Sequence, residues 1–312
     1  MPKNIRQHLL DIKNLTTEQI FDIINVARSI KHNEFEPLMN NRTVVLMFAE
    51  NSTRTKLSFE KAALNLGMKV LHFDCENSSF SKGESLKATI DNLYQMQVDA
   101  LVLRSKISGI LNNLASQTNY PISYINAGDG NHAHPTQALL DFYTMVEKIQ
   151  NVENKKISII GDIAHSRVAR SNIELLKKFG ANITVCAPSY FMPPQIENWK
   201  VNHTQNLEIA LDGADVVMCL RVQNERLEKN IYPPQSDYIK RFQVTSTKLE
   251  RYCGSNVILM HPGPVNPDVE ISRELMDSPK YGNTILQQVE NGVFIRMSVF
   301  FNYIEKYNRG DN

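Results

Sequence analysis

The sequence predicts an α/β protein of two domains, each a mostly parallel β-sheet flanked by helices. Two strand–helix–strand units lead to this prediction, one over residues 44–73 and one over residues 156–186. The chain of 312 residues is 42% hydrophobic, which is enough for two ordinary domains with a sizeable core. We expect one domain to comprise residues 1–134 and 291–312 and the other residues 135–290.

The first strand–helix–strand unit follows a helix near the start of the chain. Thr16-Thr17-Glu18-Gln19 fits a capping box, and the apolar residues of IFDIINVARSI recur after it with helical spacing. TVVLMFA (residues 43–49) is predicted as a buried strand, Gly67 as the end of the next helix, and KVLHF (residues 69–73) as the second strand. Two strands joined by a helix in this way pair in parallel.

The second unit follows a connecting helix that is expected to begin at Pro135. Strands are predicted at residues 157–160 and 183–186, with a helix between them that stops at Gly180. Later, ADVVMCL and NVILMHPGP are strand-then-loop segments, and VENGVFIRMSVFFNYIEKY is predicted as the closing helix. Substrates of open α/β sheets bind beyond the carboxyl ends of the strands, where the polar loops of this sequence are clustered.

Charge, apolar runs and cysteine spacing exclude several kinds of partner. Lys and Arg total 34 against 33 Asp and Glu, so there is no broad field for a nucleic acid or an anionic membrane. The N-terminal residues lack a signal-peptide core and no apolar run could span a bilayer, so a cytoplasmic protein is expected. The widely spaced cysteines are predicted to be reduced thiols, with neither metal nor disulfide: Cys75, Cys186, Cys219 and Cys253.

The stretch FAENSTRTKLSFE places hydroxyls and an arginine where a strand gives way to a helix. Unpaired N–H groups and the helix dipole favour an anion at a helix N-terminus, and Ser52, Thr53, Arg54 and Thr55 add donors there. A single phosphoryl group suits this cradle, because the GxxxxGK of a P-loop is absent. From these residues alone, the alternative is an ordinary helix cap with a solvated arginine.

A second arginine occupies a comparable place in the second unit. Arg54 and Arg167 each precede their helix-ending glycine, Gly67 and Gly180, by 13 residues. Each has a serine nearby, at positions 52 and 166, so both arginines are expected in the first turn of a helix that follows a strand. One matching interval carries little statistical weight. Arg167 or Arg221, taken alone, is more often a surface residue.

Several motifs together resemble one family. FAENSTRTKLSFE is similar to the carbamoyl-phosphate signature of the aspartate and ornithine carbamoyltransferases, and NAGDGNHAHPTQALLDFYT is similar to their second signature. LRVQNERL and MHPGPVNPDVEI resemble the amino-acid-binding segments of the aspartate-specific members, and Pro262-Gly263-Pro264 stands where ornithine enzymes carry a cysteine. The resemblance extends over nearly the whole chain.

The resemblance implies an activity that needs neither metal nor organic cofactor. The carbamoyl group of carbamoyl phosphate would pass to the α-amino group of L-aspartate, giving N-carbamoyl-L-aspartate and phosphate in pyrimidine synthesis. Positioning and charge stabilisation would supply the catalysis, for which arginines are suited because they stay charged and bind oxyanions in a fork. The closest alternative is another carbamoyltransferase, such as one specific for ornithine.

The resemblance also assigns roles to individual residues. Arg54 would stabilise the leaving phosphate, His134 would donate to the carbonyl oxygen, and Gln137 would hold the carbamoyl amide. The full carbamoyl-phosphate set is Ser52, Thr53, Arg54, Thr55, Arg104, His134, Gln137, Gly263 and Pro264, and the aspartate set is Lys82, Arg167, Arg221 and Gln223. The expected catalytic residues are Arg54, Thr55, Lys82, Arg104 and His134. His134, taken alone, could instead cap or pack at a helix start.

The segment ENSSFSKGESLKATI has two interpretations. Its residues fit a capping box at Ser81 and Glu84, with Lys82 as a solvated lysine in the first helical turn. The resemblance implies instead a homotrimer in which this loop enters a neighbouring subunit's active site and supplies Lys82 and Ser78, with Ser79 as the other candidate serine. Regulatory chains or a dihydroorotase are partners that the sequence leaves open.

Two other classes of protein compete with this interpretation. ISIIGDIAHSRVAR begins a Rossmann-like unit, which suggests a nicotinamide-dependent oxidoreductase. Only Gly161 of the GxGxxG motif is present, however, and Ile163 and Ser166 occupy the later positions. A non-catalytic anion-binding protein could have the same fold, since a fold alone does not determine a function.

Overall fold

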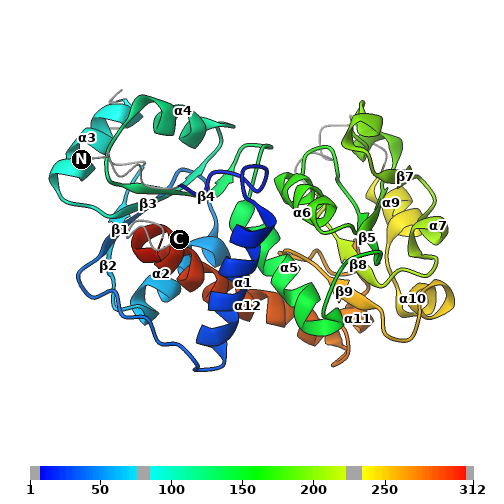
Figure 1. Cartoon of the computed structure of the whole chain (residues 1–312). Helices are drawn as coiled ribbons and strands as arrows, with labels where there is room; N and C mark the ends of the chain where they lie inside the picture. The colour runs from blue at the N-terminus through cyan, green and yellow to red at the C-terminus, as the bar shows by residue number, and fades with distance from the viewer. Residues whose placement is uncertain (1–7, 76–84, 223–233, 307–312) are drawn as a thin grey trace. The chain divides into compact units, whose positions relative to one another are not determined.

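The computed structural model describes residues 8–75, 85–222 and 234–306 (Figure 1). The chain divides into two compact units, residues 1–139 with 290–312 and residues 140–289. The first change of unit falls inside helix α5 (Pro135–Ile149), not at its first residue, where we predicted a domain boundary. The second falls inside helix α12 (Gly282–Phe300). Each unit has its own sheet and its own buried residues.

The first unit contains a four-stranded sheet in the order β2-β1-β3-β4 among its described residues. All of its pairings are parallel, with Val45 opposite both Leu71 and Leu101, so the predicted strand–helix–strand unit is confirmed. The strands are β1 (Thr43–Phe48), β2 (Lys69–Phe73), β3 (Ala100–Ser105) and β4 (Ser123–Asp129). The helices are α1 (Thr17–Lys31), α2 (Thr53–Asn65), α3 (Leu86–Gln95) and α4 (Ile110–Gln117).

Local signals in the sequence set the ends of these helices. The predicted capping box is present at α1, because Thr16 Oγ1 accepts from Gln19 N at 3.2 Å and Gln19 Oε1 accepts from Thr16 N at 3.0 Å. After α2, Gly67 takes a φ of +74°, a left-handed conformation that suits glycine and reverses the chain toward β2. Helix α3 begins at Leu86 with Ser85 as its cap, whereas the capping box considered at Ser81 and Glu84 lies outside the described residues.

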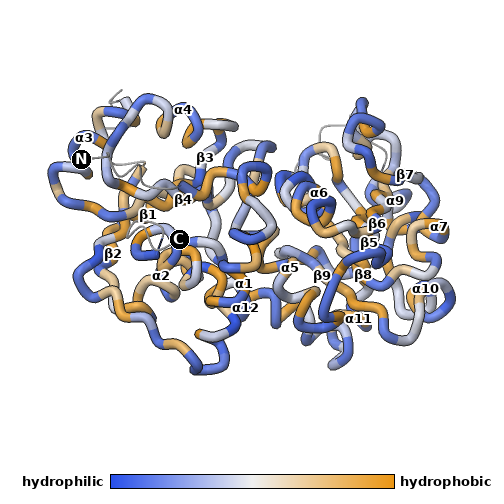
Figure 2. The backbone as a smooth tube through the Cα atoms, in the orientation of Figure 1, coloured by the Kyte–Doolittle hydropathy of each residue, from blue (hydrophilic) through white to orange (hydrophobic). Residues whose placement is uncertain are grey.

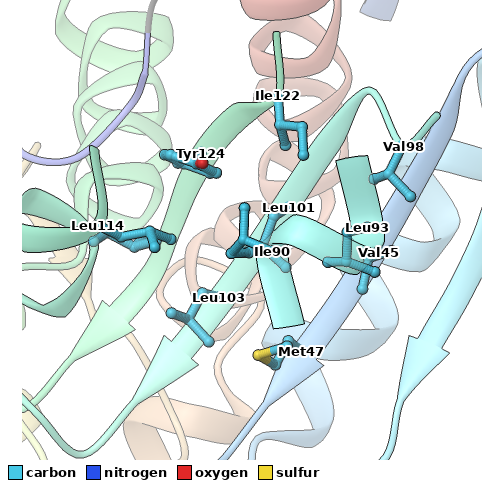
Figure 3. Close-up of a cluster of buried hydrophobic side chains, with 11 residues drawn as sticks. Val45, Met47, Ile90, Leu93, Val98, Leu101, Leu103, Leu114, Ile122 and Tyr124 are labelled. Carbon is cyan, nitrogen blue, oxygen red and sulfur yellow. The ribbon is translucent and has the colours of Figure 1, made fainter. Parts of the chain in front are cut away.

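One face of this sheet is covered by an apolar core (Figure 3). Side chains from β1, β3 and β4 pack there against α3 and α4, and each fully buried aliphatic side chain contributes about 1.5–3 kcal/mol. The members are Val45, Met47, Ile90, Leu93, Val98, Leu101, Leu103, Leu111, Leu114, Ile122 and Tyr124. This packing fixes the sheet that positions the loops after β1 and β3.

The second unit contains a five-stranded parallel sheet in the order β7-β6-β5-β8-β9 among its described residues. Its inner strands are strongly hydrophobic (Figure 2), as expected for strands buried on both faces. The strands are β5 (Lys156–Ile160), β6 (Asn182–Cys186), β7 (Asn202–Thr204), β8 (Val216–Cys219) and β9 (Ile258–Met260). The helices are α6 (Arg167–Lys178), α7 (Leu207–Leu211), α9 (Gln235–Phe242), α10 (Ser246–Tyr252) and α11 (Arg273–Asp277).

The closing helix is longer than predicted. Helix α12 begins at Gly282, seven residues before the predicted start, and a π-helix follows it from Phe301 to Lys306. The first residues of α12 do not form an apolar stripe on the buried face, because the apolar Leu286 is exposed and the buried Gln288 is polar. Gln288 is instead held by hydrogen bonds, donating to Asp141 Oδ1 at 2.7 Å and accepting from His261 N at 2.9 Å.

The last described residues of the chain are tied into the first unit. Ser123 Oγ donates to Tyr303 O at 2.7 Å and Ser298 Oγ donates to Ile23 O at 2.6 Å. The Arg42 guanidinium contacts Glu305 and also Asp99, the latter at 3.0 Å. These contacts anchor the C-terminal segment against β4, α1 and the strand that begins at Thr43.

Two findings bear on the predicted class of protein. All four cysteines are free, and three of them are buried. Within the described ranges, no helix is both long and apolar enough to cross a membrane.

Candidate active site

In each sheet the chain reverses its direction of strand addition at one point. It proceeds from β1 outward to β2 and then returns to the other side of β1 with β3, and it leaves β5 for β6 and β7 before returning with β8. The carboxyl ends of the two strands at such a reversal are the usual ligand site of an open α/β sheet. The predicted site residues follow these strands: positions 52–55 follow β1, Arg104 lies near the end of β3, Arg167 follows β5 and Arg221 follows β8.

The start of α2 offers donors that the helix does not use itself. Ser52 is the N-cap residue, with extended backbone angles, but its side chain makes no capping hydrogen bond. Thr53 and Arg54 are exposed, Thr55 is buried, and the first turn contains no acidic residue. An anion placed here would meet helix-start N–H groups, hydroxyls and a guanidinium. Of the alternative that we considered, the serine cap is absent, whereas Arg54 is exposed as that alternative expects.

Arg104 lies beside the loop that leads from β1 to α2. The Arg104 carbonyl accepts a hydrogen bond from Ala49 N at 2.9 Å, and Nη1 of Arg104 donates to Ala127 O at 3.2 Å. Its Nε lies 3.2 Å from Glu50 Oε2, with both side chains largely shielded from solvent. The structure therefore brings Arg104 to the same sheet edge as positions 52–55. Glu50 had no predicted role, although it lies inside the quoted motif.

His134 and Gln137 are buried where α5 begins. His134 is the residue before Pro135, and its carbonyl accepts from Gln137 N at 3.1 Å and Ala138 N at 3.2 Å, which starts the helix. Both side chains come from the segment that follows β4, the neighbour of β3. Their burial fits both a contact with a bound group and the packing at a helix start that we considered for His134.

Asp129 organises the glycine-rich loop before His134, and sequence reasoning missed it. This carboxylate is 1% exposed and accepts from Ala133 N at 3.0 Å and from Gly109 N at 2.6 Å. It also contacts His132 Nδ1 at 3.0 Å, so one acidic group joins the loop after β4 to the start of α4. An acid between two glycines in NAGDGN was the only signal available.

In the second unit, the loop after β5 closes on the end of β8. Gly161 has a φ of +127°, and a Cβ at this position would lie 2.8 Å from Leu220 O. Leu220 N in turn donates to Ile160 O at 2.7 Å. The lone glycine of the Rossmann-like motif is therefore explained by the close approach of two protein loops, which removes its support for a dinucleotide cradle.

Arg167 is the first residue of α6, and its helix is capped by the protein itself. Ser166 Oγ accepts from Ala169 N at 3.0 Å. Arg167 and Arg221 are both partly exposed, and they follow the adjacent strands β5 and β8. The structure thus places both predicted aspartate-binding arginines at one end of one sheet. Gln223 of the same predicted set lies outside the described residues, as do Ser78, Ser79 and Lys82.

The loop after β9 is tightly turned at Gly263. Gly263 has a φ of +69° and its N–H donates to His261 Nδ1 at 2.8 Å, while the Gly263–Pro264 peptide is cis. Both residues belong to the second unit, together with Arg167 and Arg221, whereas the other predicted carbamoyl-phosphate residues belong to the first. A glycine here lets backbone groups lie close to whatever occupies this end of the sheet.

Comparison with known proteins identifies the family. Residues 7–147 match the model described as "Aspartate/ornithine carbamoyltransferase, carbamoyl-P binding domain", and residues 153–302 match "Aspartate/ornithine carbamoyltransferase, Asp/Orn binding domain". The chain belongs to the aspartate/ornithine carbamoyltransferase family. The resemblance inferred from the motifs is thereby confirmed.

Individual relatives cover almost the entire chain. The aspartate carbamoyltransferase catalytic subunit of Thermobifida fusca is 42% identical over 300 residues, 95% of this chain and 94% of that protein. The aspartate transcarbamoylase of Trypanosoma cruzi, solved in complex with N-(phosphonacetyl)-L-aspartic acid, has a TM-score of 0.83 at 27% identity, with 97% of each chain covered. The ornithine carbamoyltransferase of Pyrococcus furiosus has a TM-score of 0.84 at 23% identity, covering 97% of this chain and 99% of that one, and so shares the fold.

The carbamoyltransferase family assignment agrees with the side chains at both sheet ends. These ends present arginines, hydroxyls and buried amide and imidazole groups, which suit anionic and carbonyl-containing ligands. In the part of the chain that the structure describes, no group of three or more His, Cys, Asp or Glu side chains could hold a metal ion.

Proposed function

We propose that this chain transfers the carbamoyl group of carbamoyl phosphate to the α-amino group of L-aspartate, in de novo pyrimidine synthesis. The observation that carries the proposal is the 42% identity to an aspartate carbamoyltransferase catalytic subunit over 95% of the chain. Pro262-Gly263-Pro264, at the start of the loop after β9, favours aspartate over ornithine as the acceptor. The products are N-carbamoyl-L-aspartate and phosphate.

Carbamoyl phosphate is assigned to the first unit. The phosphate accepts hydrogen bonds from the start of α2 and from Ser52, Thr53 and Thr55, and the Arg54 guanidinium neutralises charge on it. The uncapped N-terminus of α2 supports this role, since a phosphate can take the place of a capping side chain. Arg104, at the end of the adjacent strand β3, adds a second guanidinium.

The carbamoyl carbon is activated through its oxygen. His134 donates a hydrogen bond to the carbonyl oxygen and Gln137 holds the carbamoyl amide, both from the start of α5. The amine lone pair of aspartate attacks this carbon and forms a C–N bond, and negative charge builds on the oxygen. The C–O bond to phosphate then breaks, phosphate leaves with the electron pair, and the nitrogen loses a proton. Donors aimed at the developing oxyanion lower this barrier.

L-Aspartate is assigned to the second unit. Its two carboxylates match the two guanidinium groups of Arg167 and Arg221, with Gln223 and Lys82 as additional ligands predicted from the family. The adjacency of β5 and β8 supports this assignment, because both arginines leave the same edge of the sheet. Gly263 and Pro264 contribute backbone groups. The family resemblance assigns these groups to the carbamoyl moiety.

The chain is proposed to act as a cytoplasmic homotrimer with shared active sites. Free cysteines fit a reducing compartment. Exposed leucines on α2 and the edge strand β2 supply apolar surface that another copy could cover; they are Leu57, Leu64 and Leu71. Ser78 and Lys82 would then reach the neighbouring subunit's site.

The acceptor is tested by an assay that offers L-aspartate and L-ornithine side by side with carbamoyl phosphate. Formation of N-carbamoyl-L-aspartate alone is expected. Turnover of ornithine without aspartate would replace the proposal with the ornithine alternative. If the chain binds carbamoyl phosphate but transfers the carbamoyl group to neither amino acid, the result would favour the alternative of a non-catalytic anion-binding protein.

Subunit sharing is tested by mixing two inactive variants. Arg54→Ala and Lys82→Ala damage different parts of a shared site, so hybrid trimers should contain some sites with both residues intact and regain part of the activity. The control is a mixture of differently tagged wild-type trimers, which reports whether subunits exchange. Hybrids that form and stay inactive would exclude a Lys82 supplied by the neighbour.

A further inference from the structure

A buried carboxylate lies between the two loops that leave β8 and β9. Glu270 is 1% exposed, and its Oε1 accepts from Val222 N at 2.7 Å. Its Oε2 accepts from Asn266 N at 2.9 Å, and Asn266 Nδ2 donates to Oε1 at 2.9 Å. Three N–H donors therefore converge on one carboxyl group.

Asn266 closes this arrangement into a ring. Besides its bond to Glu270, Asn266 Nδ2 donates to Val222 O at 2.8 Å. The loop after β8 is thus held through both the N–H and the carbonyl of Val222, and the loop after β9 is held through Asn266. Val222 is the residue after Arg221, and Asn266 is two residues after Pro264. The Glu270 ring, by which we mean Glu270, Asn266 and Val222, joins two segments assigned to ligand binding.

The backbone beneath the Glu270 carboxyl is itself fixed. Val244 N donates to Glu270 O at 2.9 Å and Ser272 N donates to Val244 O at 3.0 Å, so this segment pairs in parallel with Val244. A carboxyl that extends from an anchored backbone can transmit that position to the loops it contacts. Glu270 is buried, so it can affect the loops only through its hydrogen bonds with Val222 and Asn266.

The three donors suit a carboxylate better than an amide. A carboxylate only accepts hydrogen bonds, and here its two oxygens meet three donors. A glutamine of the same shape carries an NH₂ group in place of one carboxylate oxygen. That NH₂ group would face either Asn266 N, or both Val222 N and Asn266 Nδ2. At least one buried donor would then lose its acceptor, which costs about 1–3 kcal/mol for each donor and favours a displaced loop.

We propose that Glu270 is a positioning residue for the amino-acid acceptor, holding Arg221 at the angle at which its guanidinium meets a substrate carboxylate. The proposal rests on the proposed function, in which Arg221 binds L-aspartate. Bidentate contacts between arginine and carboxylate depend strongly on geometry, so a small shift of the Val222 backbone weakens them. The residues assigned to carbamoyl phosphate in the first unit make none of these contacts.

The test compares three variants of the full-length protein. Glu270→Gln removes an acceptor without changing size, and Asn266→Ala opens the ring while leaving Glu270 bound to Val222. Glu274→Gln is the matched control, since this exposed residue of α11 makes the same change of charge outside the ring. Steady-state kinetics with varied L-aspartate, calorimetric titration with carbamoyl phosphate, and thermal unfolding are measured for each.

We expect the first two variants to raise KM for L-aspartate about tenfold, the effect of one displaced buried hydrogen bond. The loss of carbamoyl-phosphate affinity should be clearly smaller, because only Gly263 and Pro264 of its assigned residues lie in a loop that the ring holds. Glu274→Gln should match wild type throughout. Selective loss of acceptor affinity is a result that general destabilisation would not give. If Glu270→Gln does not fold, Asn266→Ala decides the question, because the buried charge and its bond to Val222 remain.

The possible outcomes separate the two proposals. Wild type that turns over L-aspartate, together with folded ring variants of unchanged KM, overturns the positioning role alone. Parallel loss of carbamoyl-phosphate affinity also overturns it, since that would indicate a general structural role. Wild type that binds carbamoyl phosphate and never uses L-aspartate overturns the proposed function and with it this inference.

Discussion

Helices α2 and α6 each follow a strand at which their sheet reverses direction, and each has an arginine in its first turn. At α6 the hydroxyl of Ser166 accepts from Ala169 N, whereas the hydroxyl of Ser52, in the same N-cap position of α2, makes no capping bond. Arg167 is the first residue of its helix and Arg54 is the second. The start of α6 therefore has a side-chain cap from its own serine, whereas the start of α2 has no side-chain cap from Ser52.

The difference indicates two ways of holding an anion. An uncapped helix start presents its N–H groups together with the side chains around them, which suits a compact phosphate. A capped helix start has already used part of that capacity, and its arginine acts through the guanidinium alone, which suits a carboxylate on a flexible substrate. Similar sequence at the two helix starts thus leaves different groups available, which is consistent with the different ligands proposed for the two units.

Removal of Arg54 should have the largest effect on this comparison. Arg54→Ala is expected to lower kcat about 10³-fold, because the leaving phosphate loses a charge partner in the transition state. Lys61→Ala removes a positive charge from an exposed position on the same helix and should leave kcat unchanged. If Arg54→Ala kept more than a tenth of the wild-type kcat, the leaving phosphate would not be stabilised at the start of α2.

The loop-holding carboxyl of the second unit should give a pH-dependent stability. Burial raises the pKa of Glu270 from 4.5 to about 7, and hydrogen bonds from Val222 and Asn266 oppose this rise. Burial and, to a smaller extent, the charge of Glu270 in turn raise the pKa of Cys219 and of Tyr238. The folded protein therefore binds this proton more tightly than the unfolded chain does. The resulting stabilisation is complete below about pH 4.5 and lost as the pH rises through about 7.

Thermal unfolding of wild type and Glu270→Gln between pH 5 and 8 measures this effect. The stability of wild type relative to the variant should fall by up to about 3 kcal/mol as the pH rises, because one pKa unit corresponds to about 1.4 kcal/mol. A constant difference between the two proteins would show that Glu270 does not titrate in this range.

Removal of Arg167 should affect the other substrate. Arg167→Ala is expected to raise KM for L-aspartate about 50-fold, through loss of one charge-assisted contact with a carboxylate, and to leave carbamoyl-phosphate affinity unchanged. Arg251→Ala, on the exposed surface of α10, is the matched control. Weaker binding of carbamoyl phosphate by Arg167→Ala would contradict the assignment of one substrate to each helix start.

The two serines offer the smallest and most direct test. Ser166→Ala should lower the free energy of unfolding by about 1 kcal/mol through loss of a cap, with no change in carbamoyl-phosphate affinity. Ser52→Ala should leave stability nearly unchanged and weaken carbamoyl phosphate by about tenfold, by loss of one hydrogen bond to a charged group. Equal stability losses would mean that both hydroxyls cap their helices in solution.

Much of this architecture follows from patterns of short range. The Thr16 capping box, the turn at Gly67 and the apolar runs of β1 and β5 depend on neighbours in the chain, and all are found as predicted. Arg54 and Arg167 could be placed in the first turns of helices that follow strands, whereas Arg221 was assigned from the family resemblance.

The supporting residues could not be predicted in the same way. Asp129, Glu270 and Gln288 bond mainly to backbone N–H groups or to distant side chains, and those partners exist only once loops have taken their final path. A single buried acid has no periodicity, so nothing local distinguishes it from a solvated one. Whether a helix start is capped by its own serine is equally a property of the folded loop, as Ser52 and Ser166 illustrate.

The return of the C-terminal segment to the first unit bears on the order of events during synthesis. Residues 140–289 are contiguous, so the second unit is complete before residue 290 is translated, whereas the first unit still lacks Tyr303 and Glu305 at that point. We therefore expect the usual tendency of N-terminal domains to fold first to be reversed here. A nascent chain stalled before residue 290 should carry a protease-resistant second unit behind an incomplete first one.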